Sequence, residues 1–436
     1  MPKLAAVAQL LQNQRKAKGE KPSIKTLARQ EWPELVENIT RQAEISGEIL
    51  EISMLTPVGQ AQMEAKFLAD GTVPAYTYNV ELLKKVVDLR RELDVLGNAA
   101  EKMYPMTRAE GFLLRLHKKA LDRDVLKTKL AASVLAKDDR RTAEVLKELY
   151  GKLDVALIGE AKQRLMVRED WPKVLPKAVL DAMTIGQLKD MKFEAKAIRA
   201  AWEWLCGQFD ILSEIRIEIT DAVKAVNIEM RPLTHDSFAQ ISPTREMSGK
   251  ELPQISEHEF AGHALQAMNR GVLTLDMGNG SHNEGRTTLI EQDFREKFYG
   301  ESESDGNTNR YYYVLAIERA LKGMGFAQIF AELDEIRKGE KRKETVQVVG
   351  RATRGLTDMS NPYGLAWTKA QDYLRGNIFA SELREFGLEY LLAAGIADEE
   401  TMLNITAEFD WNEGVGVLPY EPVAVGERLL QQYILR

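Results

Sequence analysis

Cysteine and histidine are scarce in this chain. Its 436 residues include one cysteine, Cys206, and five histidines. A single cysteine cannot form a disulfide within the chain, and it excludes a metal site built from several thiolates. Any zinc would therefore be bound by nitrogen and oxygen atoms, which leaves histidine and acidic residues as the candidate ligands.

Long apolar runs are missing as well. No stretch of the sequence approaches the roughly 18 consecutive apolar residues that a membrane-spanning helix requires. The short, mildly apolar run at 5–11 lacks the apolar core and the cleavage pattern of a signal peptide. We therefore expect a soluble, cytoplasmic protein with no membrane partner.

Neither sign of charge dominates the sequence. The net charge is -7, and acidic and basic residues are interspersed along the chain. Nucleic-acid-binding domains usually carry a basic patch or stripe, so we expect no nucleic-acid partner. Hydrophobic residues make up 44% of the chain, which is enough for a sizeable core and, at this length, for two or three domains.

The pattern of apolar residues changes along the chain. Helical spacing dominates up to Cys206 and returns after residue 286, whereas 215–219 and 226–230 alternate as half-buried strands do. We expect a predominantly helical α+β fold with a small sheet. The predicted division is an N-terminal helical extension, a helical domain and a third domain that holds the strands, at 1–48, 49–205 and 206–436.

Two of the five histidines fall in one run, His258-Glu259-Phe260-Ala261-Gly262-His263. Zinc peptidases commonly place two histidines four residues apart on one helix face, with a glutamate next to the first. Here the spacing is five residues, which on a regular helix separates the side chains by about 140°. One extra residue accommodated as a π-bulge would restore a shared face, and Gly262 would absorb the distortion most easily.

The surroundings of the motif favour a helix. Ser256 is the predicted N-cap, because Glu259 follows it three residues later as in a capping box. On this helix Glu259 would lie beside the ion rather than bind it. There it could take a proton from a zinc-bound water, whose pKa the ion lowers toward ~7.

A catalytic zinc usually has three protein ligands and one open position. Glu284 is the first candidate for the third ligand, because it begins a helix after a glycine-rich connection long enough to fold back over the motif. Glu291, two turns later on the same face, and His282 are the alternatives. A purely structural role for Glu284 would be to stabilise a helix N-terminus.

These segments resemble the tyrosine/phenylalanine carboxypeptidase family, which includes the microtubule-associated tyrosine carboxypeptidases and bacterial proteins named for a QEGLA motif. The family shares a His-Glu-x-x-x-His helix, followed by a Glu-Glu-Gly-Leu-Ala-type segment whose core Glu284-Gly285 matches. The segments 351–355 and 368–376 resemble its Arg-rich stretch and its Thr-Lys-Asp-x-x-Tyr-Leu-x-Gly-like segment. The resemblance runs from about residue 50 to 380.

The chain departs from the family pattern at several positions. Asn283 replaces the first glutamate of the pair, Arg286-Thr287 replaces Leu-Ala, and Ala370 replaces the acid after Lys369. The first 50 and the last 55 residues match poorly. These departures bear on substrate choice more than on metal binding.

The resemblance implies a zincin-like catalytic domain, with the small sheet packed on the motif helix, and a zinc metallopeptidase activity. It implies one Zn²⁺ bound by His258, His263 and Glu284, with Glu259 activating water for attack on a peptide carbonyl. By the same resemblance Tyr373 would donate a hydrogen bond to the negative oxygen formed in that attack.

A carboxypeptidase must also recognise the C-terminus of its peptide or protein substrate. A guanidinium offers two parallel hydrogen bonds to a carboxylate. Arg351 and Arg354 are the candidates for this contact, with Lys369 as a further one. The tyrosine triplet 311–313 is a weaker candidate for a substrate role, because consecutive residues on a helix point three ways and at least one should be buried.

Two other functions remain open. Some aminopeptidases and dipeptidyl peptidases also use a His-Glu-x-x-x-His helix with glycine before the second histidine, but their double-glutamate Arg-Ala-Glu motif is not found here. A catalytically idle zinc-containing binding protein would have no structural use for Glu259. Neither the natural substrate nor the oligomeric state follows from the sequence.

Overall fold

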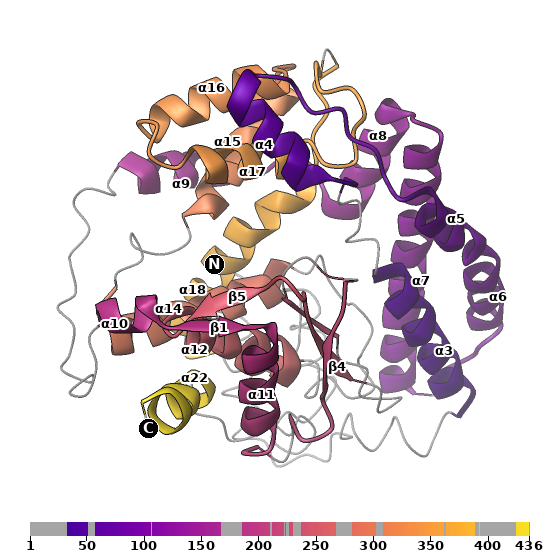
Figure 1. Ribbon diagram of the computed structural model, residues 1–436. Helices are drawn as coiled ribbons and strands as arrows, with labels where there is room; N and C mark the ends of the chain where they lie inside the picture. The colour runs from indigo at the N-terminus through magenta and orange to yellow at the C-terminus, as the bar shows by residue number, and fades with distance from the viewer. Residues whose placement is uncertain are drawn as a thin grey trace.

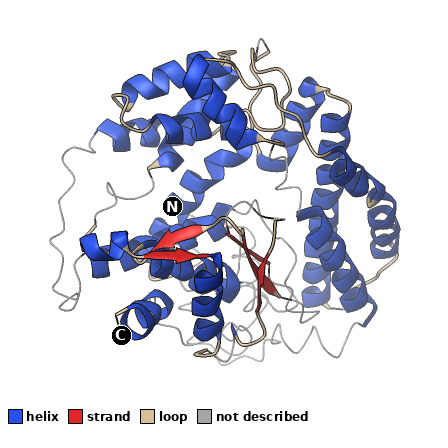
Figure 2. Ribbon diagram, viewed as in Figure 1, coloured by secondary structure: helices blue, strands red, loops and turns tan. Residues whose placement is uncertain are grey.

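The computed structural model describes residues 33–50, 57–105, 107–166, 185–209, 212–221, 223, 226–229, 237–266, 281–301, 308–361, 363–388, 392 and 424–435. Helices dominate this part of the chain and the strands are short and few (Figures 1 and 2). The expected predominance of helices, with a small sheet, is therefore confirmed. None of the described helices combines the length and apolar character needed to cross a bilayer.

The N-terminal part is a series of helices with identifiable caps. The side chain of Asn79 accepts a hydrogen bond from the backbone of Leu82, and Thr107 and Glu110 form a reciprocal capping box. The helices are α3 (Pro33–Leu50), α4 (Gln60–Asp70), α5 (Val80–Asp88), α6 (Arg90–Glu101), α7 (Arg108–Leu135), α8 (Asp139–Tyr150) and α9 (Val155–Met166).

The described strands follow these helices. β2 (Arg216–Ile219) runs parallel to β4 (Phe238–Ile241), and β3 (Val226–Glu229) pairs with the other side of β4 in the antiparallel sense. The strands predicted at 215–219 and 226–230 thus correspond to β2 and β3. A separate antiparallel pair joins β1 (Lys192–Glu194) to β5 (Glu246–Ser248).

The remaining helices lie before, among and after the strands in the chain. They are α10 (Ile185–Asp190), α11 (Ala195–Cys206), α12 (Glu251–Ser256), the π-helix η4 (Glu257–Ala264), α14 (Ser281–Tyr299), α15 (Asn309–Leu321), α16 (Phe326–Ile336), α17 (Arg342–Ala352), the 3₁₀ turn η7 (Thr368–Gln371), α18 (Asp372–Glu385), α22 (Ala424–Leu429) and η8 (Leu430–Ile434).

Helical spacing returns in the sequence after residue 286, and 309–336 within that stretch forms two helices, α15 and α16. Gly323 has a φ of 85°, a left-handed conformation that ends a helix readily. The side chain of Gln328 then accepts a hydrogen bond from the backbone N–H of Gly325, at the start of the next helix. The apolar pattern continues through this break because both helices bury side chains in the same cluster.

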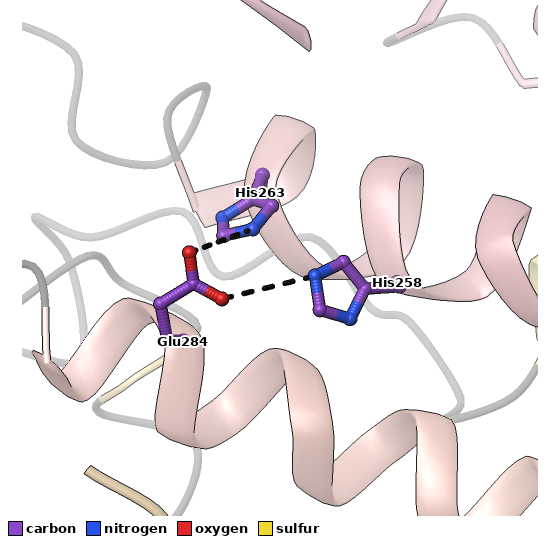
Figure 3. A group of neighbouring side chains, drawn as sticks. All are labelled: His258, His263 and Glu284. Carbon is purple, nitrogen blue, oxygen red and sulfur yellow. Dashed lines mark ion pairs between the residues drawn. The ribbon is translucent and has the colours of Figure 1, made fainter. Parts of the chain in front are cut away.

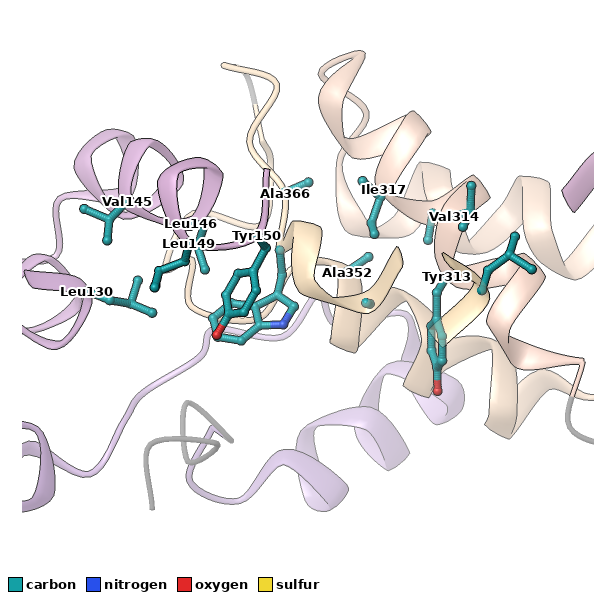
Figure 4. Close-up of a cluster of buried hydrophobic side chains, with 14 of the residues drawn as sticks. Leu130, Val145, Leu146, Leu149, Tyr150, Tyr313, Val314, Ile317, Ala352 and Ala366 are labelled. Atoms are coloured by element: carbon teal, nitrogen blue, oxygen red, sulfur yellow. The ribbon is translucent and has the colours of Figure 1, made fainter. Parts of the chain in front are cut away.

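Buried apolar side chains form two clusters that do not follow chain order. The first joins α3–α9 to α15–α18, and Figure 4 shows part of it, with buried side chains from α7, α8, α15 and α17. The second joins α10, α11, the strands, α12, η4 and α22. α14 contributes Leu289 to the first cluster and Ile290, Phe294 and Phe298 to the second. It therefore lies between the two cores.

The predicted domain boundaries stay predictions. Within the described part, α11 ends at Cys206 and packs in the second cluster, whereas α15–α18 pack with the N-terminal helices. The sequence pattern locates helices along the chain, but it does not say which core each helix joins.

Candidate metal centre

The motif histidines lie on the π-helix η4, which continues directly from α12. In a π-helix each turn is one residue longer than in an α-helix, so residues five apart come to one face. The rings of His258 and His263 accordingly lie with their centroids 5.1 Å apart. The π distortion predicted from the histidine spacing is confirmed, and it extends over 8 residues rather than a single bulge.

The predicted N-cap at Ser256 is wrong. Ser256 lies inside the continuous helix, where its hydroxyl accepts a hydrogen bond from Trp202 Nε1 at 2.8 Å. The cap is instead formed upstream, where Ser248 Oγ accepts from the backbone of Glu251 and the Glu251 carboxylate accepts from the backbone of Ser248. The Ser-x-x-Glu pattern occurs at 248–251 and again at 256–259, and the earlier of these two begins the helix.

His258, His263 and Glu284 form one group (Figure 3). Each histidine Nε2 lies 3.9 Å from an oxygen of Glu284. Among the described residues, this is the group of three histidine, cysteine or acidic side chains whose ligand atoms lie within 4.8 Å of one another. Two ligands of a tetrahedral zinc, each about 2.1 Å from the ion, are separated by about 3.4 Å, so small side-chain rotations would close the shell.

The chemistry of the group suits zinc. Two nitrogens and one carboxylate are the donor set typical of catalytic zinc sites. The three side chains are 17%, 25% and 30% exposed, so solvent reaches the group. An ion there could therefore keep a water molecule as its fourth ligand.

Glu291, the alternative third ligand, supports the histidine instead. Its Oε2 lies 2.9 Å from His258 Nδ1, and its Oε1 accepts a hydrogen bond from Gln254. A carboxylate on Nδ1 fixes the tautomer that leaves Nε2 free to bind a metal. The position of Glu291 on the same face as Glu284 is visible in the sequence, but this role is not. The side chain of His282, the other alternative, lies outside the described part.

Excess negative charge surrounds the two histidines. Burial raises the pKa of Glu259 to about 7, helped by the charges of Glu284 and Glu291 and opposed by His258. Burial also tends to lower the pKa of His258, but the hydrogen bond and charge of Glu291, with the other two carboxylates, raise it to about 9. A divalent cation would replace that proton and neutralise the carboxylates.

Two glycines let the helices of this site approach closely. A Cβ atom added to Gly285 would lie 2.0 Å from the carbonyl oxygen of Gly376, where α14 packs on α18. A Cβ atom added to Gly262 would lie 2.2 Å from Cγ2 of Thr287, where α14 packs on η4. Gly285 and Gly262, which stand next to Glu284 and His263 in the sequence, therefore leave room for α18 and η4 to pack closely on α14.

Arg351 lies between two tyrosines. Its guanidinium carbon is 5.1 Å from the ring centroid of Tyr313 and 5.2 Å from that of Tyr373. Its Nη1 also donates a 3.2 Å hydrogen bond to the Tyr313 hydroxyl. The phenol of Tyr373, then Tyr313 and the charge of Glu284, raise the pKa of Arg351 against the effect of burial. This arginine is therefore electrostatically coupled to the metal group.

Arg354 follows one turn later. Its Nε has no hydrogen-bond partner among the described residues, and in that part of the chain neither Arg354 nor Arg351 forms an ion pair with a carboxylate. Burial, and then the positive charge of Arg351, lower the pKa of Arg354. Two adjacent guanidinium groups thus lack an acidic partner in the described structure.

Tyr373, in the first turn of α18, is a hydrogen-bond donor at neutral pH. The charge of Arg351 favours its ionised form, but the charge of Glu284 and burial outweigh it and raise the pKa of Tyr373 to about 12. All three tyrosines of the triplet 311–313 are buried, and of these Tyr313 contacts Arg351. The participation of Tyr313 was missed at the sequence level, because nothing in the triplet indicates which ring faces the arginine.

Lys369 has a different neighbour. Its ammonium lies 5.8 Å from the ring centroid of Tyr150, at the C-terminal end of α8. The contacts that join Arg351 to its two tyrosines do not include this lysine. Its predicted role in substrate binding stays a prediction.

No protein-family model and no curated protein matches this chain. The resemblance to the tyrosine/phenylalanine carboxypeptidases therefore rests on the quoted motif residues. The arrangement of the side chains supplies an independent basis for a functional proposal.

Proposed function

We propose that this protein is a zinc metallopeptidase of the carboxypeptidase type, which removes the last residue of a peptide or protein. One Zn²⁺ would be bound by Nε2 of His258, Nε2 of His263 and the carboxylate of Glu284. When bound, the ion would lower the pKa of a water molecule and polarise the carbonyl under attack. A cytoplasmic location and a zincin-like catalytic domain form part of the same proposal.

Glu259 would act as the general base. Burial raises the pKa of Glu259 in the metal-free protein, and a carboxylate beside the ion could accept a proton from water and return it to the leaving amine. Tyr373 keeps its proton, so its hydroxyl can donate a hydrogen bond to the oxygen that becomes negative during the attack.

Arg351 and Arg354 are the residues that favour a carboxypeptidase over an aminopeptidase. Arg351 and Arg354 present positive charge near the metal group, and no carboxylate of the described residues forms an ion pair with either guanidinium, although the charge of Glu284 acts on Arg351 at longer range. A C-terminal carboxylate would supply the missing negative charge and accept parallel hydrogen bonds from a guanidinium. An aminopeptidase would require acidic groups at this position, because its substrate presents an ammonium.

An idle binding protein is the less favoured alternative. A structural zinc site has four protein ligands, whereas the group here has three and is accessible to solvent. The raised pKa of Glu259 also costs stability without serving a structural purpose.

The test uses four versions of one peptide, with a free or amidated C-terminus and a free or acetylated N-terminus. We expect the zinc-loaded protein to shorten only the peptides with a free C-terminus, by one residue, whatever their N-terminus. Mass spectrometry of the products measures this directly. Equal cleavage of the amidated peptides, or shortening from the N-terminus, would contradict the proposal.

A further inference from the structure

Arg286 is a buried arginine two residues after Glu284. Only 5% of it is exposed, and its Nη1 donates a 2.9 Å hydrogen bond to the carbonyl oxygen of Ala261. Burying a guanidinium costs free energy unless its hydrogen bonds are satisfied. Ordering this long side chain costs further free energy through the loss of conformational entropy.

Ala261 lies inside the π-helix η4, between the two histidines. At the end of η4 the backbone N–H of Leu265 bonds the carbonyl oxygens of Phe260 and Gly262. The carbonyl of Ala261 lies between these two, where the five-residue step of the π-helix changes to the four-residue step of an α-helix and one carbonyl is left over. A buried carbonyl without a donor is unfavourable. A donor from outside the helix stabilises the π-helical form relative to a regular helix, in which every interior carbonyl has its own N–H.

The neighbouring residue of α14 acts on the same segment. Thr287 is fully buried and packs against Gly262 so closely that a Cβ atom there would lie 2.2 Å from its Cγ2. The first two turns of α14 thus contact η4 twice, at Ala261 and at Gly262, and supply Glu284 to the metal group. One short segment of α14 therefore supplies the proposed third ligand, Glu284, and also contacts the helix η4 that bears His258 and His263.

We propose that Arg286 is a positioning residue that holds η4 in its π-helical form and so sets the spacing of His258 and His263. The leucine that the family pattern has at this position could not donate the hydrogen bond. This inference rests on the metal site of the proposed function, but it does not depend on which bond the enzyme cleaves.

The test compares three variants of the full chain, without an activity assay. Arg286→Met removes the donor, and Arg286→Lys keeps a donor of nearly the same reach. Arg295→Met is the matched control, because Arg295 is also a buried arginine of α14 but bonds Glu301 rather than η4. The readouts are Co²⁺ affinity, the visible spectrum of bound Co²⁺, and amide hydrogen exchange over 257–266 in the metal-free protein.

We expect Arg286→Met to bind Co²⁺ about tenfold or more weakly, as loss of a group that orients metal ligands commonly does. Its spectrum should change, and exchange over 257–266 should accelerate. Arg286→Lys should recover most of the affinity, and Arg295→Met should resemble the wild type in all three readouts.

Wild-type Co²⁺ affinity and exchange in Arg286→Met would overturn the role of Arg286 alone. Equal losses in Arg286→Met and Arg295→Met, with no recovery in Arg286→Lys, would also overturn it, because they would indicate a general loss of stability. A wild-type protein that bound no Co²⁺ would refute the metal site itself, and the proposed function with it.

Discussion

At the residue scale, the proposed carboxypeptidase specificity depends on single side chains. Arg354 is the clearest case, because its Nε lacks a partner among the described residues and burial already disfavours its charge. A substrate carboxylate would relieve both conditions at once. Charge-assisted hydrogen bonds of this kind contribute about 1.5–3 kcal/mol each.

Arg354→Gln should therefore lower kcat/KM for peptides with a free C-terminus by about 10- to 100-fold, mostly through KM, and leave zinc binding unchanged. Steady-state kinetics measure the effect. The control is Arg342→Gln, also near α17 but exposed and paired with Asp334, which should retain wild-type kinetics. An unchanged KM in Arg354→Gln would remove this arginine from the substrate site.

Glu291 would act on the proposed zinc ion through His258, whose Nδ1 it contacts. Replacing its carboxylate by an amide weakens the hold on Nδ1 without removing any of the three ligands. Glu291→Gln should lower zinc affinity about 10- to 100-fold, measured by competition with a chelator. Glu296→Gln on the same helix is the control and should bind zinc normally. Wild-type affinity in Glu291→Gln would contradict the orienting role.

At the scale of elements, the crossing of α14 and α18 depends on the absence of a side chain at Gly285. Gly285→Ala should destabilise the protein by about 1–3 kcal/mol, because the added methyl group would overlap the backbone of Gly376. Gly97→Ala in α6 is the control, since nothing lies within 4 Å of its Cβ position. The control should be neutral or more stable in urea unfolding. Equal effects of the two changes would contradict the close crossing.

α7 carries a buried histidine that should make the fold sensitive to acid. His117 is fully buried, and neither ring nitrogen has a partner among the described residues. Burial, with a smaller effect of Lys118, lowers the pKa of His117 to about 4 from 6.5. The unfolded chain therefore binds a proton from about pH 6.5 downward, whereas the folded chain does so only near pH 4.

The free energy of unfolding should consequently fall between pH 6.5 and 4, by about 2–3 kcal/mol from this residue. His117→Leu should remove that part of the decrease and leave the slope above pH 7 unchanged. Urea unfolding at several pH values measures it. The same acid dependence in both proteins would show that His117 is not its source.

Element prediction succeeded where the sequence pattern is local. The alternation at 215–219 and the odd histidine spacing each correspond to the structure found, in β2 and in η4. The prediction of an N-cap at Ser256 failed because the same Ser-x-x-Glu pattern stands eight residues upstream, at 248–251, and only packing selects between the two positions. The partnership of Gly285 with Gly376 joins residues far apart in the chain, and no local pattern reports it.

At the scale of the whole molecule, the candidate site lies where the two cores meet. The motif helix η4 packs in the second cluster, whereas α15, α17 and α18, which carry the tyrosines and arginines, pack with the N-terminal helices. α14 has side chains in both and supplies Glu284. Metal binding and substrate recognition would thus come from different cores, joined by α14.

This arrangement also explains the limits of prediction for the site. The grouping of His258, His263 and Glu284 was predictable, because the two histidines share one short motif and Glu284 follows closely. The grouping of Arg351 with Tyr313 and Tyr373 was not, since it requires three helices of the first core to meet. Only the resemblance to a family indicated Arg351 and Tyr373 in advance.

The central claim is that a zinc ion and Glu259 together hydrolyse the last peptide bond of a substrate. The most direct measurement compares zinc content and C-terminal residue release in the wild type and in Glu259→Gln, with Glu335→Gln on the exposed face of α16 as the control. We expect one zinc per chain in all three proteins, and release slowed about 100-fold or more only in Glu259→Gln. Wild-type release by zinc-loaded Glu259→Gln, or no zinc in the wild type, would contradict the account.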